Sequence, residues 1–239
     1  MTSDLAHLLD VSEHTWPPAH RWEQDGFILR EGQGGGQRVS AATATGPVTD
    51  QQIADAAGAM EAMGQRAIFQ LRDDQHDLSA QLDALGYIIK DPTIAYVLPI
   101  EPLTDRPIPR VTAFTIWEPL AIMNEIWATD GIGPERLAVM DRAACKTGIL
   151  ARWNEKPAGA AFAGLHADVV MVHGLVVLPH QRRQRVAEWM MRRAAYWGQA
   201  HGATSIAVLC VAANEGANAL YRALGFRPVG RYHYRVKPE

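Results

Sequence analysis

Cysteine is scarce in this sequence, and long apolar runs are missing. The 239 residues include two cysteines, Cys145 and Cys210, with no second cysteine or histidine at metal-binding spacing, so we expect neither disulfides nor a metal site. The longest mainly apolar stretch, Val169 to Leu178, is too short to span a bilayer, and we expect no membrane partner. The first ten residues carry acids but no apolar segment, which predicts no signal peptide and a cytoplasmic location.

An excess of basic residues is also absent. The chain has 23 Lys and Arg against 26 Asp and Glu, for a formal net charge of -3. A nucleic-acid-binding protein is therefore disfavoured, because such proteins present a basic surface. What the chain does have is 48% hydrophobic residues and seven tryptophans, enough for one large core or two modest ones.

Short patterns occur twice along the chain. Phe27 to Arg30 resembles Ile149 to Arg152, and Ala84-Leu85-Gly86-Tyr87 resembles Ala223-Leu224-Gly225-Phe226. Between the two sets, Pro99 to Pro109 holds four prolines, which is typical of a linker. We interpret the pattern as a diverged tandem duplication, and the alternative is a chance match of short stretches.

Two further segments are expected to be structural. The glycines Gly34 to Gly36 lie between strand-like segments, so we expect a hairpin turn there rather than a phosphate loop. Arg192 and Arg193 follow one another on a predicted helix, and we expect them on its solvated face.

The stretch from Leu175 to Ala187 carries the first functional signal. An apolar strand ends at Pro179, a basic loop follows, and a helix begins near Val186. Free backbone N–H groups and the positive end of the helix dipole form an anion site, and a diphosphate fits it. The alternative is an ordinary strand-to-helix connection with solvated arginines.

A second stretch, after a buried strand at 205–211, favours the anion-site interpretation of the loop. Together the two stretches resemble the GNAT superfamily of acyl-CoA-dependent N-acyltransferases. Its phosphate loop, Q/R-x-x-G-x-G/A, is matched by Arg182-x-x-Arg185-x-Ala187. Its later motif, N-x-x-A-x-x-L-Y-x-x-x-G-F, is matched by Asn214, Ala217, Leu220, Tyr221, Gly225 and Phe226. One departure is Arg185, which stands where the family has a glycine and reduces the expected diphosphate affinity.

The resemblance implies an α/β fold of two similar halves, each with a mixed, mostly antiparallel sheet flanked by helices. Residues 1–105 would form a degenerate half without cofactor motifs, with Leu82 where the other half has Tyr221. Residues 106–239 would form the catalytic N-acetyltransferase domain. The implied reaction transfers an acetyl group from acetyl-CoA, as co-substrate, to a primary amine of a small molecule or peptide in a ternary complex. A homodimer is compatible with this interpretation. The alternative is a catalytically silent acyl-CoA sensor or interaction module.

The resemblance also implies roles for individual residues. The cofactor would be held by Leu175, Val176, Val177, Arg182, Arg183, Gln184, Arg185, Val186, Ala187 and Asn214. Asn214 would alternatively cap the following helix. Tyr221 would be the general acid for the leaving thiolate, or else a packed helix tyrosine.

His173 is the candidate base, because imidazole titrates near neutral pH, and the alternative is a hydrogen-bonded core histidine. Strand alternation is expected to place it on one face with Leu175 and Val177. The acceptor is not specified by any motif. Trp117, Trp127, Trp153 and the segment Tyr232 to Tyr234 are expected either to line an aromatic pocket or to belong to the core.

Overall fold

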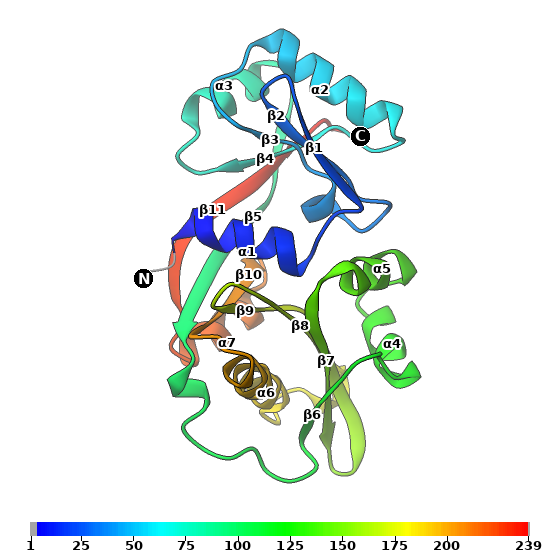
Figure 1. Cartoon of the computed structure of the whole chain (residues 1–239), viewed down its shortest axis with the longest axis vertical. Coiled ribbons are helices and arrows are strands. Elements are labelled where there is room, and N and C mark those ends of the chain that lie inside the picture. The colour runs from blue at the N-terminus through cyan, green and yellow to red at the C-terminus, as the bar shows by residue number, and fades with distance from the viewer. Residues whose placement is uncertain (1–3, 239) are drawn as a thin grey trace.

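The computed structural model describes residues 4–238 and is built around one eight-stranded sheet. Its strands, in the order β4-β11-β5-β10-β9-β8-β7-β6, cross the whole molecule (Figure 1). They are β4 (Ile68–Arg72), β5 (Ile88–Pro99), β6 (Ala113–Ile116), β7 (Cys145–Trp153), β8 (Lys156–His166), β9 (Val169–Val177), β10 (Ser205–Val211) and β11 (Arg227–Val236). A smaller antiparallel sheet contains β1 (His20–Gln24), β2 (Phe27–Glu31) and β3 (Thr43–Ala44).

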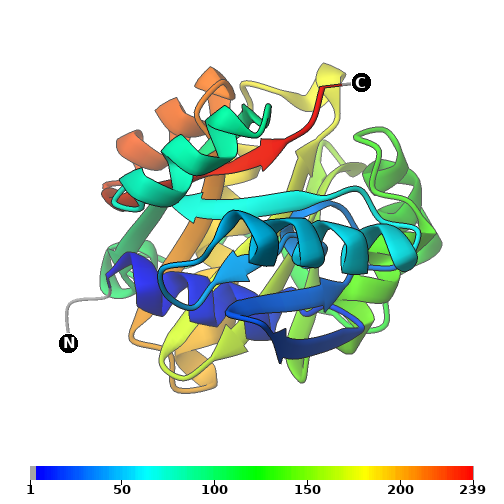
Figure 2. The same ribbon diagram turned by 90° about the horizontal axis from the view of Figure 1, so that it is seen from above.

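Seven α-helices surround these sheets. They are α1 (Leu5–Thr15), α2 (Asp50–Ala62), α3 (His76–Ala84), α4 (Ala121–Ala128), α5 (Pro134–Arg142), α6 (Val186–Ala200) and α7 (Glu215–Ala223), with short 3-10 turns η1 (Gln37–Val39), η2 (Glu101–Leu103) and η3 (Pro179–Gln181). Helices α4 and α5 lie together at one side in the view from above (Figure 2). Within the described residues, no helix is both long and apolar enough to cross a membrane. The expected α/β architecture with mixed sheets flanked by helices is confirmed.

Helices α1 and α6 pack on opposite faces of the large sheet. Leu8 and Val11 of α1 share a buried cluster with Val169, Met171 and Ala207. The alternate residues of the same strands, which include Val170, Val172, Ile206 and Val208, instead pack with the apolar face of α6. This alternation follows from the two-residue period of a strand, and it gives the sheet a buried core on each side.

The last strand of each half lies in the sheet of the other half. Strands β4 and β5 are joined by α3, as β10 and β11 are joined by α7, yet β5 pairs with β10, from Ser205↔Pro99 to Val211↔Thr93. Correspondingly, β11 pairs with β4, and β5 and β11 pair with each other. Residues 1–105 and 106–239 thus share one continuous sheet, although the proline-rich segment between them is irregular.

Gly34 to Gly36 lie in a loop between the antiparallel strands β2 and β3, but the returning strand is short. The chain after the glycines first forms η1, and β3 then pairs with β2 at Phe27↔Ala44 and Ile28↔Thr43. The reason is packing: a Cβ on Gly35 would lie 2.4 Å from the side chain of Val139 in α5, so only glycine lets the loop approach that helix. The loop brings Arg38, in η1, to the junction of the two halves.

Candidate functional site

Strands β9 and β10 separate at one end and leave an opening in the sheet. They are parallel and paired from Ser205↔Val169 to Val208↔Val172, and the pairing ends there. A cavity of about 870 Å³ occupies the opening, between the end of β9, the start of α6, the end of β10 and α7. Of the residues expected to form a site, those that line it are His173, Leu175, Val176, Val177, Arg182, Arg183, Arg185, Val186, Ala187, Asn214 and Tyr221. Gln184 is not among its lining residues.

A bulge in β9 shapes this cavity. The register of β9 against β8 shifts between His173 and Val176, and Gly174 has φ +53°. The expectation that His173, Leu175 and Val177 share a face is wrong, because the extra residue of the bulge reverses the alternation. His173 contacts α1, whereas Leu175 and Val177 pack against the cluster on the α6 side.

His173 is a buried histidine with a partner on each ring nitrogen. Its Nδ1 accepts from Nη1 of Arg38 at 3.0 Å, since a guanidinium can only donate. Its Nε2 must then carry the proton, and it donates to Oγ1 of Thr15 at 2.9 Å, which donates onward to the carbonyl of Val11. Burial, followed by the charge of Arg38, holds the pKa of His173 well below 6.5. These contacts favour the core-histidine alternative over a base, because the free lone pair is already engaged.

The turn into α6 offers backbone donors to the cavity. The first helical bond runs from the amide of Trp189 to the carbonyl of Arg185, so the amides of residues 186–188 precede the helical ladder. Arg185, at the family's glycine position, has φ +61°, and Arg183 has φ +62°. The backbone therefore keeps the left-handed conformation that glycine adopts without cost, even though arginine is present.

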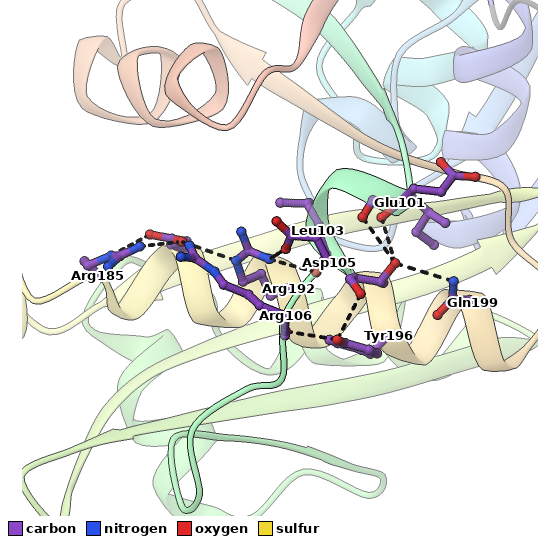
Figure 3. Close-up of polar contacts among 11 residues, drawn as sticks. Glu101, Leu103, Asp105, Arg106, Arg185, Arg192, Tyr196 and Gln199 are labelled. Carbon is purple, nitrogen blue, oxygen red and sulfur yellow. Dashed lines mark hydrogen bonds and ion pairs between the residues drawn. The ribbon is translucent and has the colours of Figure 1, made fainter.

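Side chains behind this turn form an ion-pair network (Figure 3). Glu188 accepts from Arg185 at 2.8 and 2.9 Å and from Arg192 at 3.2 Å, and it also contacts Arg106. The hydrogen bond from Arg185 is the largest effect on the Glu188 carboxyl, and it keeps the pKa of that group below its usual value. Arg106 and Asp105 come from the proline-rich segment, which is thereby attached to α6.

The expected solvated face at Arg192 and Arg193 is wrong. Arg192 is 5% exposed and binds Glu188, Asp105 and the carbonyl of Leu103. Arg193 donates to the carbonyl of Ala113 at the start of β6. Both arginines therefore connect α6 to preceding segments, and a sequence pattern of two adjacent basic residues gives no indication of partners some 80 to 90 residues away.

Tyr221 is buried in the wall of the cavity. Its ring lies 6.0 Å from Tyr96 and 5.7 Å from Phe226, measured between centroids, and the residue is 7% exposed. Its hydroxyl has no hydrogen-bond partner among residues 4–238. Burial, with a smaller effect from Cys210, raises the pKa of Tyr221 above its ordinary value of 10, so the phenol keeps its proton at working pH. This is the state that a proton donor requires.

Asn218 is a residue near the site that sequence reasoning missed. Its amide nitrogen donates to the carbonyls of Val211, Ala212 and Asn214, and its Oδ1 accepts from the hydroxyl of Tyr96 at 3.0 Å. It therefore fixes the loop between β10 and α7. Asn214 itself accepts from the amide of Ala217, which is the expected helix cap.

Away from this cavity, three exposed or half-exposed groups cluster beside α1. Asp10, His14 and His166 bring their ligand atoms within 4.8 Å of one another. The two imidazoles are stacked in parallel at 3.7 Å, and Asp10 is ion-paired with both. We assign these contacts to ordinary surface pairing, because no further buried group points to a ligand.

The splayed strands β9 and β10 and the start of α6 lie in a segment that resembles a known family. Residues 116–226 match the model of the acetyltransferase (GNAT) family.

Solved structures with the same fold extend the likeness to both halves. A GCN5-related N-acetyltransferase from Kribbella flavida has 19% identity and a TM-score of 0.74, over 100% of this chain and 97% of that one. A functionally unknown conserved protein from Staphylococcus epidermidis has 13% identity and a TM-score of 0.67, over 90% and 92%. A tandem GNAT protein from the clavulanic acid biosynthesis pathway has 12% identity and a TM-score of 0.62, over 96% and 86%. A comparison with curated proteins found no match.

Proposed function

We propose that this protein is an N-acetyltransferase that transfers an acetyl group from acetyl-CoA to a primary amine. The observation that carries the proposal is the cavity between β9 and β10, which unites the α6 amides with Tyr221. The match of residues 116–226 to the acetyltransferase (GNAT) family model supports the same activity. The proposal keeps residues 106–239 as the catalytic region and 1–105 as a half without its own cofactor site.

The chain's own groups fit a diphosphate and an extended pantetheine arm. Amides of Val186 and Ala187 and the positive end of α6 would bind the diphosphate, with Arg182 and Arg183 adding charge. The edge of β9 from Leu175 onward no longer pairs with β10, so its backbone can pair with the arm. A backbone donor at this edge would stabilise the oxyanion that develops on the thioester carbonyl, an effect of roughly 3 kcal/mol.

Tyr221 would supply the proton for the leaving thiolate. In the reaction a C–N bond forms as the C–S bond breaks, the amine loses a proton, and sulfur gains one. The phenol of Tyr221 is neutral, and its hydroxyl has no hydrogen-bond partner among residues 4–238, so it suits this donation. We assign His173 a positioning role, because its lone pair is held by Arg38. The amine proton then leaves through water in the cavity.

The test is calorimetric titration with acetyl-CoA and CoA, followed by mass measurement of products from an amine panel. Ala187→Pro removes one of the helix-start amides without changing charge, and proline is tolerated in a first turn. We expect CoA binding to weaken about tenfold, the value of one charge-assisted hydrogen bond. Ala187→Gly, which keeps the amide, is the matched control. Wild-type protein that binds CoA but acetylates no amine would support the silent sensor instead.

A further inference from the structure

A second cavity, of about 650 Å³, lies between α1, the small sheet, β4 and β11. It contacts the α1 face of the large sheet, whereas the first cavity opens beside α6. Among the described residues, the two cavities share Arg38 and Leu209 in their linings. Leu209 follows the last residue of β10 that pairs with β9, so the cavities adjoin where these two strands separate.

Arg38, at this meeting point, is a cation without a carboxylate. No Asp or Glu among residues 4–238 lies within 4.0 Å of its guanidinium as an ion pair, and its Nε is shielded from solvent without a partner. Nη1 binds His173, and the guanidinium also interacts with the phenol hydroxyls of Tyr232 and Tyr234. None of these partners is a carboxylate. A buried cation without an anion is costly, and a planar guanidinium can bind a carboxylate through two parallel bonds.

Arg30, which lines the same cavity, has the carboxylate partner that a buried arginine usually has. It binds both carboxylate oxygens of Glu13 at 2.6 to 3.0 Å and donates to the carbonyl of Ala41 and to Thr43. Arg38 has no carboxylate partner among residues 4–238. It is held in place by His173, which Thr15 supports, and by the phenols of Tyr232 and Tyr234.

Two neighbours of Arg38 add to this picture. Tyr234 lies beside it and supplies no charge, since burial raises the pKa of that phenol well above 10. Ser12, also in the cavity wall, has a buried hydroxyl without a partner. The guanidinium of Arg38 and the hydroxyl of Ser12 can both donate to an anion. Of the aromatic residues considered for an acceptor pocket, Tyr232 lines this cavity, whereas Trp127 is buried in the core.

We propose that the second cavity binds the acceptor and that Arg38 holds a carboxylate carried near its amine, so that the acceptor is an amino acid or a similar amino-carboxylic acid. This inference rests on the proposed function, because it assigns the acceptor side of the same reaction. His173 and Thr15 orient Arg38, which explains why a histidine in this position is buried, neutral and fully bonded. Arg38 becomes the residue that determines specificity.

The first experiment uses the wild-type protein. Acetylation rates are compared for α-amino acids and their α-carboxamides. 2-Aminoethylphosphonate tests whether the site prefers a phosphonate to a carboxylate. We expect kcat/KM to be 10- to 100-fold higher for the best acid than for its own amide, the usual value of a charge-assisted pair. Equal rates for acid and amide, or a preference for the phosphonate, would overturn the inference. If those results came with normal acetyl-CoA binding and transfer to other amines, the proposed function would stand.

The second experiment tests Arg38 itself. Arg38→Gln should lower kcat/KM for the acid 10- to 100-fold and for the amide less than threefold, while calorimetry gives unchanged acetyl-CoA binding. Arg72→Gln is the matched control, because Arg72 lines the same cavity but already pairs with Asp74 at 3.1 Å, and we expect at most a threefold loss. An equal loss for acid and amide in Arg38→Gln would show a merely structural role and overturn the assignment.

Discussion

The sharpest test of the proposed chemistry is Tyr221→Phe, which removes one oxygen atom. The ring keeps its contacts with Tyr96 and Phe226, and the lost hydroxyl has no protein partner within residues 4–238. The free energy of unfolding should therefore change by less than about 0.5 kcal/mol. Turnover should fall about 10²-fold, a typical value for a general acid and equivalent to about 2.7 kcal/mol in the barrier.

Tyr96→Phe provides a matched control with the opposite pattern. The Tyr96 hydroxyl donates to Oδ1 of Asn218, and both groups are buried. Removal leaves that oxygen unsatisfied and should cost about 1–3 kcal/mol of stability. Because Asn218 fixes the loop after β10, a small loss of CoA affinity should follow. The rate of the chemical step should not change, because Tyr221 can still donate its proton.

The assay is thiol release from acetyl-CoA at saturating amine, with urea unfolding measured in parallel. Burial raises the pKa of Tyr221, so its phenol stays protonated and the wild-type rate should show no decline from this group below about pH 10. The reasoning is refuted if Tyr221→Phe turns over like the wild type. It is equally refuted if the variant loses turnover only in step with CoA affinity.

Four further outcomes are expected. Because burial lowers the pKa of His173, the wild type should lose up to about 1.4 kcal/mol of stability per pH unit as pH falls below about 6.5. Urea titrations of His173→Gln should lack this pH-dependent loss. The pH–rate profile of the same variant should still show an acidic limb, because His173 is not the base. Glu188→Gln should lower the free energy of unfolding by roughly 1–3 kcal/mol, whereas Asp74→Asn, in an exposed pair, should cost less than about 0.5 kcal/mol. Arg185→Gly should be more stable than Arg185→Ala by about 1 kcal/mol in the same assay, because φ is +61° there. Residues 106–239 produced alone should show no cooperative unfolding by circular dichroism, and a folded, CoA-binding fragment would contradict the shared sheet.

Short-range features of the site could be predicted from the sequence. The strand that ends just before Pro179, the helix from Val186 and the cap at Asn214 each depend on residues a few positions apart. Local patterns of this kind fix backbone conformation before any tertiary contact forms. The cavity that unites them with Tyr221 follows from the resemblance, since the motifs are those of one family.

Long-range features could not be predicted. The partners of His173, Thr15 and Arg38, are 158 and 135 residues away in the sequence. The bulge at Gly174 could not be predicted either. The amino-acid composition of a regular strand does not differ from that of a strand with one extra residue. The exchange of β5 and β11 was equally hidden, since both strands can pair with either β4 or β10 by pattern alone.

The exchanged strands explain why a half without cofactor motifs contributes to the site. Strand β5 pairs with the edge of β10 that faces away from the splay, and Arg38 of the N-terminal half lines the first cavity. The same half supplies η1 and α1, and with them Arg38 and its support through His173. On the tandem-duplication hypothesis, this half would have lost the diphosphate motifs and kept two structural tasks, the shared sheet and the proposed acceptor cavity.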